Sequence, residues 1–168
     1  TPPAHRISIV IPVYNEKPTL GLLLERVFDA PLPAGCEREV IVVDDGSTDG
    51  TGDAILELVR RNPGFKAVRL GRNAGQTAAF SAGVAHAAGE FIACLDADLQ
   101  NDPADLALLI DKLNEGYDVV SGWRKRRKDA WLSRQLPSRA ANAVISWITG
   151  VPLHDYGCTL QIYRPKYP

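Results

Sequence analysis

Short apolar stretches and helical patterns alternate along this chain. The apolar stretches are rich in branched residues and bounded by turn residues, which predicts buried β-strands. They lie at 6–13, 39–43, 66–70, 91–95, 117–121 and 158–163. Between them apolar residues recur every three or four positions, as in Leu20, Leu23 and Leu24, which predicts helices. This alternation predicts an α/β fold, with a mostly parallel central sheet and helices on both faces.

Polar clusters follow five of the predicted strands. They are 12–16, 44–49, 71–76, 96–100 and 122–124. The carboxyl ends of parallel strands meet at one edge of a sheet, and ligands bind beyond that edge. The sequence therefore predicts that these five clusters share the edge where a ligand binds.

Two carboxylates stand at the end of the fourth strand. Side chains alternate in an extended segment, so Asp96 and Asp98 are expected to converge while Ala97 points away. Like charges repel unless a cation lies between them, and oxygen ligands suit Mg²⁺ or Mn²⁺, which also bind phosphates. A helix cap is the alternative interpretation. It accounts for Asp102, which precedes Pro103 at the first helical position, but not for the pair.

Two further clusters have both a structural and a functional interpretation. The acidic turn 44–49 is placed to hydrogen-bond a ribose or a pyrimidine base, and it equally fits an Asx turn followed by a helix cap. The segment 12–16 puts an aromatic ring and a carboxylate at the same edge, where a base can stack. A lone tyrosine such as Tyr14 is, however, more often a core residue.

The sequence lacks the glycine-rich loops that hold phosphates in other nucleotide-binding folds. Gly46, Gly50 and Gly52 have the wrong spacing for Gly-x-Gly-x-x-Gly, and Gly-x-x-x-x-Gly-Lys-Ser/Thr is absent. A metal held by carboxylates is the remaining way to neutralise a diphosphate. Arg72 is placed to add a charge-assisted contact.

The strongest local charge feature is the basic run 124–128, reinforced by Arg134 and Arg139 and flanked by Trp123 and Trp131. A solvated loop and a nucleic-acid patch are two ordinary explanations for such a run. Tryptophan favours membrane interfaces, so an anionic acceptor, such as a lipid phosphate, is the interpretation preferred here. The net charge of −1 gives no general argument for nucleic acid, and none is expected as a partner.

Composition is that of an ordinary globular domain. The 168 residues are 45% hydrophobic and 23% charged, enough for one domain with a sizeable core. Cys36, Cys94 and Cys158 lack Cys-x-x-Cys spacing and are expected to be reduced core thiols in a cytosolic compartment. No apolar run approaches the roughly 18 residues that span a bilayer. The chain begins at Thr1 without a methionine and stops just after a strand, so a fragment of a longer protein is expected.

Taken together, the motifs resemble the family 2 glycosyltransferases of GT-A fold. The resemblance covers nearly the whole chain and rests first on 12–16, 44–49, Asn73-x-Gly75 and Asp96-Ala97-Asp98-Leu99-Gln100-x-x-Pro103. Later elements resemble the branch that includes dolichol-phosphate mannose synthases and bacterial polyprenyl-phosphate glycosyltransferases. These are Ser121-Gly122-Trp123-Arg124, Pro137-Ser138-Arg139-x-x-Asn142 and His154-Asp155-Tyr156-Gly157-Cys158.

The resemblance implies a single GT-A catalytic domain over 1–168, with a nucleotide-binding half at 1–100 and a truncated acceptor-side half at 101–168. It implies a UDP- or GDP-linked sugar as the donor. The residues expected to bind that nucleotide sugar are Pro12, Tyr14, Glu16, Asp44, Asp45, Ser47, Arg72, Gln76 and Asp96. The expected ligands of Mg²⁺ or Mn²⁺ are Asp96, Asp98 and Gln100. The expected catalytic residues are Asp98, Arg124, Arg139 and Asp155.

The implied reaction is an inverting transfer of a hexose to a polyprenyl phosphate, dolichyl or undecaprenyl, at the cytoplasmic face of a membrane. Metal and arginines stabilise the departing diphosphate. An acceptor phosphate is already anionic and needs no general base, whereas a saccharide hydroxyl needs one, for which Asp155 is the candidate. His154 is given little weight, because adjacent side chains rarely face each other. Transfer to a saccharide, and a catalytically silent nucleotide-binding or membrane-docking module, remain alternatives.

Overall fold

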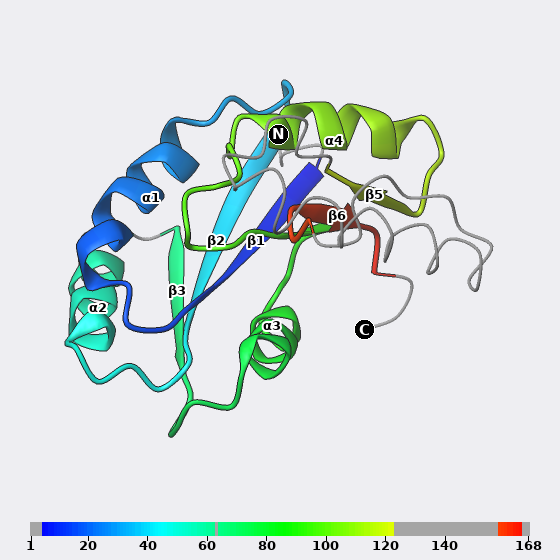
Figure 1. Ribbon diagram of the computed structural model, residues 1–168. Helices are drawn as coiled ribbons and strands as arrows, with labels where there is room; N and C mark the ends of the chain where they lie inside the picture. Colours follow the sequence, from blue (N-terminus) through cyan, green and yellow to red (C-terminus); the bar gives the residue numbers. More distant parts are fainter. Residues whose placement is uncertain (1–4, 63, 123–157, 166–168) are drawn as a thin grey trace, which may run out of the picture.

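The computed structural model describes residues 5–62, 64–122 and 158–165, and a six-stranded sheet runs through this part of the chain (Figure 1). The strands are β1 (His5–Val13), β2 (Cys36–Asp44), β3 (Phe65–Arg69), β4 (Phe91–Cys94), β5 (Val119–Ser121) and β6 (Gln161–Tyr163). The helices are α1 (Lys17–Asp29), α2 (Thr51–Arg61), α3 (Gln76–Ala85) and α4 (Asp105–Asn114). Strands and helices alternate up to β5, as the sequence predicts.

The sheet has the order β3-β2-β1-β4-β6-β5 and is mostly parallel, which confirms the prediction. The strands β3, β2, β1 and β4 pair in parallel, whereas β6 is antiparallel to both β4 and β5. Because β6 is reversed, its beginning lies at the same edge as the carboxyl ends of the other strands. Residues just before β6 therefore reach the edge where the polar clusters meet.

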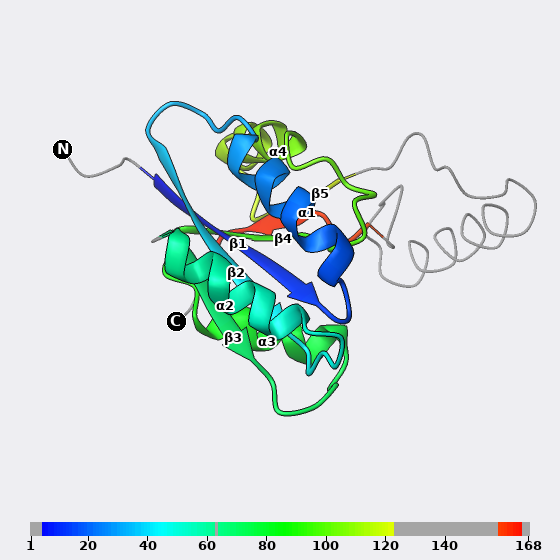
Figure 2. The same cartoon turned by 90° about the vertical axis from the view of Figure 1, so that its left-hand side faces the viewer.

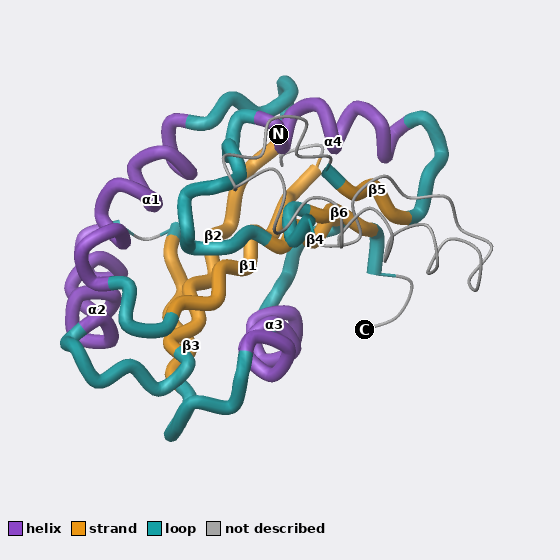
Figure 3. Tube along the Cα trace, viewed as in Figure 1, coloured by secondary structure: helices purple, strands orange, loops and turns teal. Residues whose placement is uncertain are grey.

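Helices cover both faces of the sheet, as predicted (Figure 3). Alternate residues of β1 point to opposite layers: Ile9 packs in the larger core with α1 and α4, and Val10 packs in the smaller core under α3. Both side chains are fully buried. In Figure 2 α1 and α2 lie on the near side of the sheet, which is the side opposite α3.

The helix α3 packs close to the sheet because one of its faces carries small residues. A Cβ at Gly83 would collide with Val10 Cγ1 and lie 3.0 Å from Val43 Cγ2. The alanine-rich sequence predicts this close packing, although the helix spans Gln76–Ala85 and is shorter than the predicted 74–88. Since α3 begins with Gln76, its packing fixes a side chain at the carboxyl edge of the sheet.

Several element boundaries differ from those expected. The strand β2 begins at Cys36 rather than at residue 39, because its polar first residues pair with β1. Arg38 contributes there by donating to carbonyls at the end of α1, including that of Ala30 at 2.6 Å. The helix α4 begins at Asp105, two residues after the predicted start. Asp102 Oδ1 accepts the Ala104 N–H at 3.0 Å, so Asp102 forms a turn just before the helix.

A buried carboxylate lies at the opposite, amino-terminal edge of the sheet. Glu39 accepts the Ser8 hydroxyl at 2.5 Å, pairs with Lys66 Nζ at 2.5 Å and accepts the Ala88 N–H at 2.9 Å. Burial alone would raise the pKa of Glu39, but the hydrogen bonds from Lys66 and Ser8 outweigh it and the pKa is lowered. This network joins β1, β2, β3 and the turn that leads into β4.

The thiols of Cys36, Cys94 and Cys158 are free, in agreement with the expectation of reduced cysteines. Burial, and then the neighbouring Asp96 carboxylate, raises the pKa of Cys94 to about 11, so this thiol is neutral at physiological pH. Among the described residues no helix combines the length and the apolar character needed to cross a bilayer.

Candidate functional site

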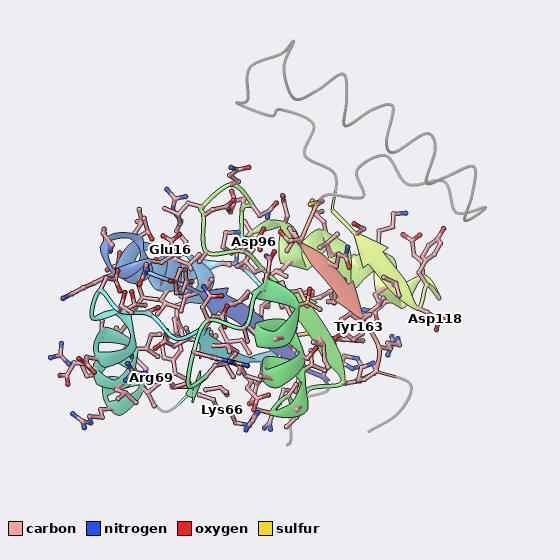
Figure 4. The ribbon with its side chains drawn as sticks, turned by 60° about the horizontal axis from the view of Figure 1, so that its bottom comes forward. Glu16, Lys66, Arg69, Asp96, Asp118 and Tyr163 are labelled. Atoms are coloured by element: carbon pink, nitrogen blue, oxygen red, sulfur yellow. The ribbon has the colours of Figure 1, made fainter. Side chains whose placement is uncertain are left out.

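A cavity of about 440 Å³ opens at the carboxyl edge of the sheet, where the sequence predicts a ligand site. This volume lies within the range of small-molecule pockets. The cavity is formed by the segments that follow β1, β2, β3 and β4 and by the start of α3. Its lining residues are Pro12, Val13, Tyr14, Glu16, Asp45, Asn73, Gly75, Gln76, Asp96, Ala97 and Asp98. Figure 4 shows Asp96 beside the first turn of α3 and the start of β6.

The end of β1 and the segment that follows it contribute three of the predicted nucleotide-binding residues to this cavity. Pro12 is buried, and Tyr14 is 44% exposed, so Tyr14 is a cavity residue rather than a core residue. Glu16 is the residue that precedes α1, and its Oε2 accepts the Thr19 hydroxyl at 2.7 Å. The aromatic ring of Tyr14 is thus free to stack on a planar ligand such as a base.

The acidic turn after β2 is divided between two roles. Asp44 is 1% exposed and does not line the cavity. Its Oδ1 accepts the Ser47 N–H at 2.9 Å, and its Oδ2 forms an ion pair with Arg69 Nε at 3.2 Å. Ser47 also lies outside the cavity lining and accepts the Asn15 N–H at 2.9 Å. Asp44 and Ser47 therefore stabilise the turn, as the structural interpretation expects.

Asp49, the last acidic residue of this turn, connects the starts of two helices. It accepts the Thr51 hydroxyl at 2.5 Å and the Thr51 N–H at 2.9 Å, and it accepts the Lys17 N–H at 3.3 Å. These hydrogen bonds, that of the Thr51 hydroxyl first, lower the pKa of Asp49. The helix-cap interpretation accounts for this residue.

Asp45 is the member of the turn that lines the cavity. It is 4% exposed and accepts the N–H groups of Ala74 and Gly75 at 2.8 and 2.9 Å. The turn also touches that loop through Gly46, whose φ is +74°; a Cβ there would lie 2.6 Å from Asn73 N. The Asn73-x-Gly75 motif is thus explained by contacts with the acidic turn, which position the loop before α3.

Asp96 and Asp98 both line the same cavity beyond the end of β4, and the convergence of their carboxylates on one cation stays a prediction. The expected extended segment is wrong beyond Asp96, because the chain bends at 97–99 and Leu99 has φ of +59°. Ala97 consequently forms part of the same wall instead of pointing away. Asp98 is exposed, and its Oδ1 accepts the Gln100 N–H at 3.0 Å.

Asp96 is held from two sides by residues distant in the sequence. Gln76 Nε2 donates to Oδ1 at 2.5 Å, and the Thr159 hydroxyl donates to Oδ2. Gln76 is among the residues that the sequence predicts to bind the nucleotide sugar, whereas Thr159 is not. In the sequence, Thr159 is distinguished only by its position at the start of the last predicted strand. That position predicts a place at the carboxyl edge of the sheet only when β6 is known to run antiparallel to β4.

The remaining residues that the sequence predicts for the site do not line the cavity or lie outside the described residues. Arg72 and Gln100 are exposed and are absent from the cavity lining, so the diphosphate contact and the third metal ligand stay predictions. Arg124, Arg139 and Asp155 lie outside the described residues, and so does the neighbouring His154.

The chemistry of this donor set fits a divalent cation that is bound together with a phosphate ligand. Within the described ranges no group of three His, Cys, Asp or Glu side chains is arranged to hold a metal by itself. Mg²⁺ is usually bound by one or two carboxylates plus substrate phosphates rather than by a complete protein cage. Asp96 and Asp98 supply two such carboxylates in one open cavity.

The fold and the cavity define a GT-A type glycosyltransferase domain: a mostly parallel sheet, helices on both faces, and paired aspartates beyond the carboxyl edge. The sequence profile of Glycosyl transferase family 2 matches residues 8–165, and the chain belongs to this family. The expected family and fold are thereby confirmed.

Several known proteins are similar to this chain. A dodecaprenyl-phosphate galacturonate synthase from Rhizobium johnstonii is 47% identical over 160 residues, which are 94% of this chain and 47% of that protein. The chain thus spans about half the length of this curated relative. A mannosyltransferase from Pyrobaculum calidifontis in complex with GDP-mannose and Mn²⁺ has a TM-score of 0.71 at 25% identity, covering 95% of this chain and 44% of the other. TarS from S. aureus in complex with UDP-GlcNAc has a TM-score of 0.61 at 26% identity, covering 95% and 45%.

Proposed function

We propose that this chain is the catalytic domain of a metal-dependent, inverting glycosyltransferase that moves a hexose unit from a nucleoside-diphosphate sugar to a polyprenyl phosphate. The observation that carries the proposal is the cavity that Asp96 and Asp98 line together with Tyr14 and Asp45. The similarity to a polyprenyl-phosphate sugar synthase supports the choice of acceptor. A lipid acceptor in turn places the reaction at a membrane surface, on the cytoplasmic face where nucleotide sugars are found.

The donor would bind with its nucleoside against the segments after β1 and β2 and its diphosphate near the aspartate pair. Tyr14 offers an exposed ring on which a base can stack, and Glu16 lies on the same wall. Asp96 and Asp98 would hold Mg²⁺ or Mn²⁺ together with the diphosphate, and Gln100 is the third ligand that we propose. When bound, the cation neutralises charge that develops on the leaving nucleoside diphosphate. One similar solved structure contains GDP-mannose and another contains UDP-GlcNAc, which supports a donor linked to one of these two nucleotides.

The acceptor determines whether a general base is required. A phosphate monoester oxygen is anionic at neutral pH and attacks the anomeric carbon directly, with inversion, while the carbon–oxygen bond to the diphosphate breaks. Arg124 and Arg139 are proposed to bind the acceptor phosphate by charge-assisted hydrogen bonds. Asp155 would act as a base only if a saccharide hydroxyl took the place of the phosphate.

The decisive experiment incubates the full-length protein with Mn²⁺, a polyprenyl phosphate and a panel of labelled nucleotide sugars, including GDP-mannose, UDP-glucose and a UDP-linked hexuronate. A lipid-linked product that disappears in Asp98→Asn supports the proposal. If no donor yields a lipid-linked product, the acceptor assignment is wrong. Nucleotide binding without any transfer, to lipid or to saccharide, would instead identify a catalytically silent module.

A further inference from the structure

The residues around Asp96 form a chain of directional hydrogen bonds that begins in the interior. Asn101 is 7% exposed, and its Nδ2 donates to Thr159 Oγ1 at 3.4 Å. The Thr159 hydroxyl then donates to Asp96 Oδ2. On the other side of Asn101, the Cys158 Sγ lies 3.6 Å from Asn101 Oδ1 and 4.0 Å from the Leu160 carbonyl oxygen, both of which accept from a thiol.

The direction of each hydrogen bond follows from the chemistry of the groups. A hydroxyl has one hydrogen to donate, and an ionised carboxylate only accepts. Because the Asn101 amide donates to Thr159 Oγ1, the single hydroxyl hydrogen is left for Asp96. Gln76 holds the other oxygen of Asp96 from α3 at 2.5 Å. Donors on both oxygens, from two different elements, restrict rotation of the carboxylate plane.

A carboxylate has about four lone-pair positions, and the hydrogen bonds from Gln76 and Thr159 occupy two of those of Asp96. Asp96 lines the cavity with Asp98 and Gln76, so the carboxylate that Gln76 and Thr159 orient borders the space in which a cation or ligand would bind. Hydrogen-bonding partners of metal-binding carboxylates orient those ligands, and their loss costs about 10–100-fold in metal affinity or activity.

We propose that Thr159, aligned by Asn101, is a positioning residue that orients the Asp96 carboxylate for binding of the divalent cation and the donor diphosphate. The inference rests on the proposed function and deepens it, because it makes the start of β6 a required part of the donor site. In the described part of the chain, β6 is the strand that returns antiparallel to β4, and this reversal is what brings Thr159 to the carboxyl edge.

The test measures Mn²⁺ binding to the full-length protein by the electron paramagnetic resonance signal of free Mn²⁺, with and without UDP or GDP. Thr159→Val keeps the shape of the side chain and loses the hydroxyl, so it is expected to raise the Kd for Mn²⁺ about tenfold or more. Thr159→Ser keeps the hydroxyl and is expected to restore wild-type affinity. Thr159→Ala lacks both the hydroxyl and the branched methyl, and it serves if the valine variant does not fold. Thermal unfolding of each variant reports structural damage separately.

The possible results separate the two claims. Wild-type affinity in Thr159→Val or Thr159→Ala overturns the inference while leaving the proposed function in place. Equal weakening in Thr159→Ser also overturns it, because packing rather than the hydroxyl would then be responsible. If the wild-type protein binds no Mn²⁺ with either nucleotide, the proposed function fails and the inference fails with it. Ser81→Ala is a matched control, since it removes a hydroxyl that donates only to the backbone on the exposed side of α3.

Discussion

Two glycines in helices are expected to respond in opposite ways to the same substitution. Gly83 in α3 faces the sheet, where a Cβ would collide with Val10 and lie 3.0 Å from Val43 Cγ2. Gly21 in α1 is exposed, and a Cβ there would meet nothing within 4 Å. Alanine is favoured over glycine in a helix by about 1 kcal/mol in both cases. Only at Gly83 must the neighbours move, and overpacking of this kind costs about 1–3 kcal/mol.

Gly83→Ala is therefore expected to lower the free energy of unfolding by about 1 kcal/mol, the middle of the range of about 0–2 kcal/mol that is left after the gain in helix propensity is subtracted. For a domain of this size that corresponds to a fall in Tm of about 2–4 °C. Gly21→Ala is expected to raise the free energy of unfolding by about 0.5–1 kcal/mol. Urea unfolding followed by circular dichroism measures both. Because α3 carries Gln76 into the cavity, Gly83→Ala should also weaken nucleotide binding, whereas Gly21→Ala should not.

Equal and favourable effects of both substitutions would refute this reasoning, because they would mean that the packing of α3 on β1 is loose. An unchanged nucleotide affinity in Gly83→Ala would mean that the packing of α3 on the sheet does not determine the geometry of the cavity.

Other predictions concern charges that the structure pairs. The pKa of Glu39 is lowered in the folded state, so its contribution to stability is present above the ordinary glutamate pKa and is lost as pH falls through the folded value. In Glu39→Gln the free energy of unfolding, measured by urea unfolding, should therefore fall less steeply as the pH is lowered. Asp45→Ala should raise the Kd for UDP or GDP in calorimetry, because the loop before α3 loses two backbone anchors, and an unchanged Kd would contradict that role. Arg38→Met should lower the free energy of unfolding by about 1–3 kcal/mol by leaving carbonyls at the end of α1 unpaired. Asp98→Asn, or removal of divalent cations with a chelator, should abolish transfer while leaving Tm within a few degrees of wild type, since Asp98 is exposed.

The acidic turn shows why residue type alone did not assign roles. Asp44 and Asp45 are adjacent and chemically identical, and the sequence offered both a structural and a functional interpretation for them. In the structure Asp44 lies beside Gly52 and is buried, and it forms an ion pair with Arg69, whose side chain is 54% exposed. Asp45 instead reaches the cavity wall. Alternation along the strand predicts opposite directions for the two, but not which direction leads to a ligand.

The sequence by itself determined the layered α/β fold, the edge at which the site lies and the aspartate pair that marks it. Those features can be predicted from local hydrophobic periodicity, together with the rule that the carboxyl ends of parallel strands lie at one edge of a sheet. The tertiary structure alone decided that Thr159 meets Asp96, that the segment after β4 bends, and that Arg72 and Gln100 lie away from the cavity lining. These features depend on which way β6 runs and on the backbone angles of single loop residues. The direction of β6 and these backbone angles produce no periodic pattern in the sequence. A hydrogen bond between residues about 60 positions apart depends on how the strands pack, not on the spacing of the two residues along the chain.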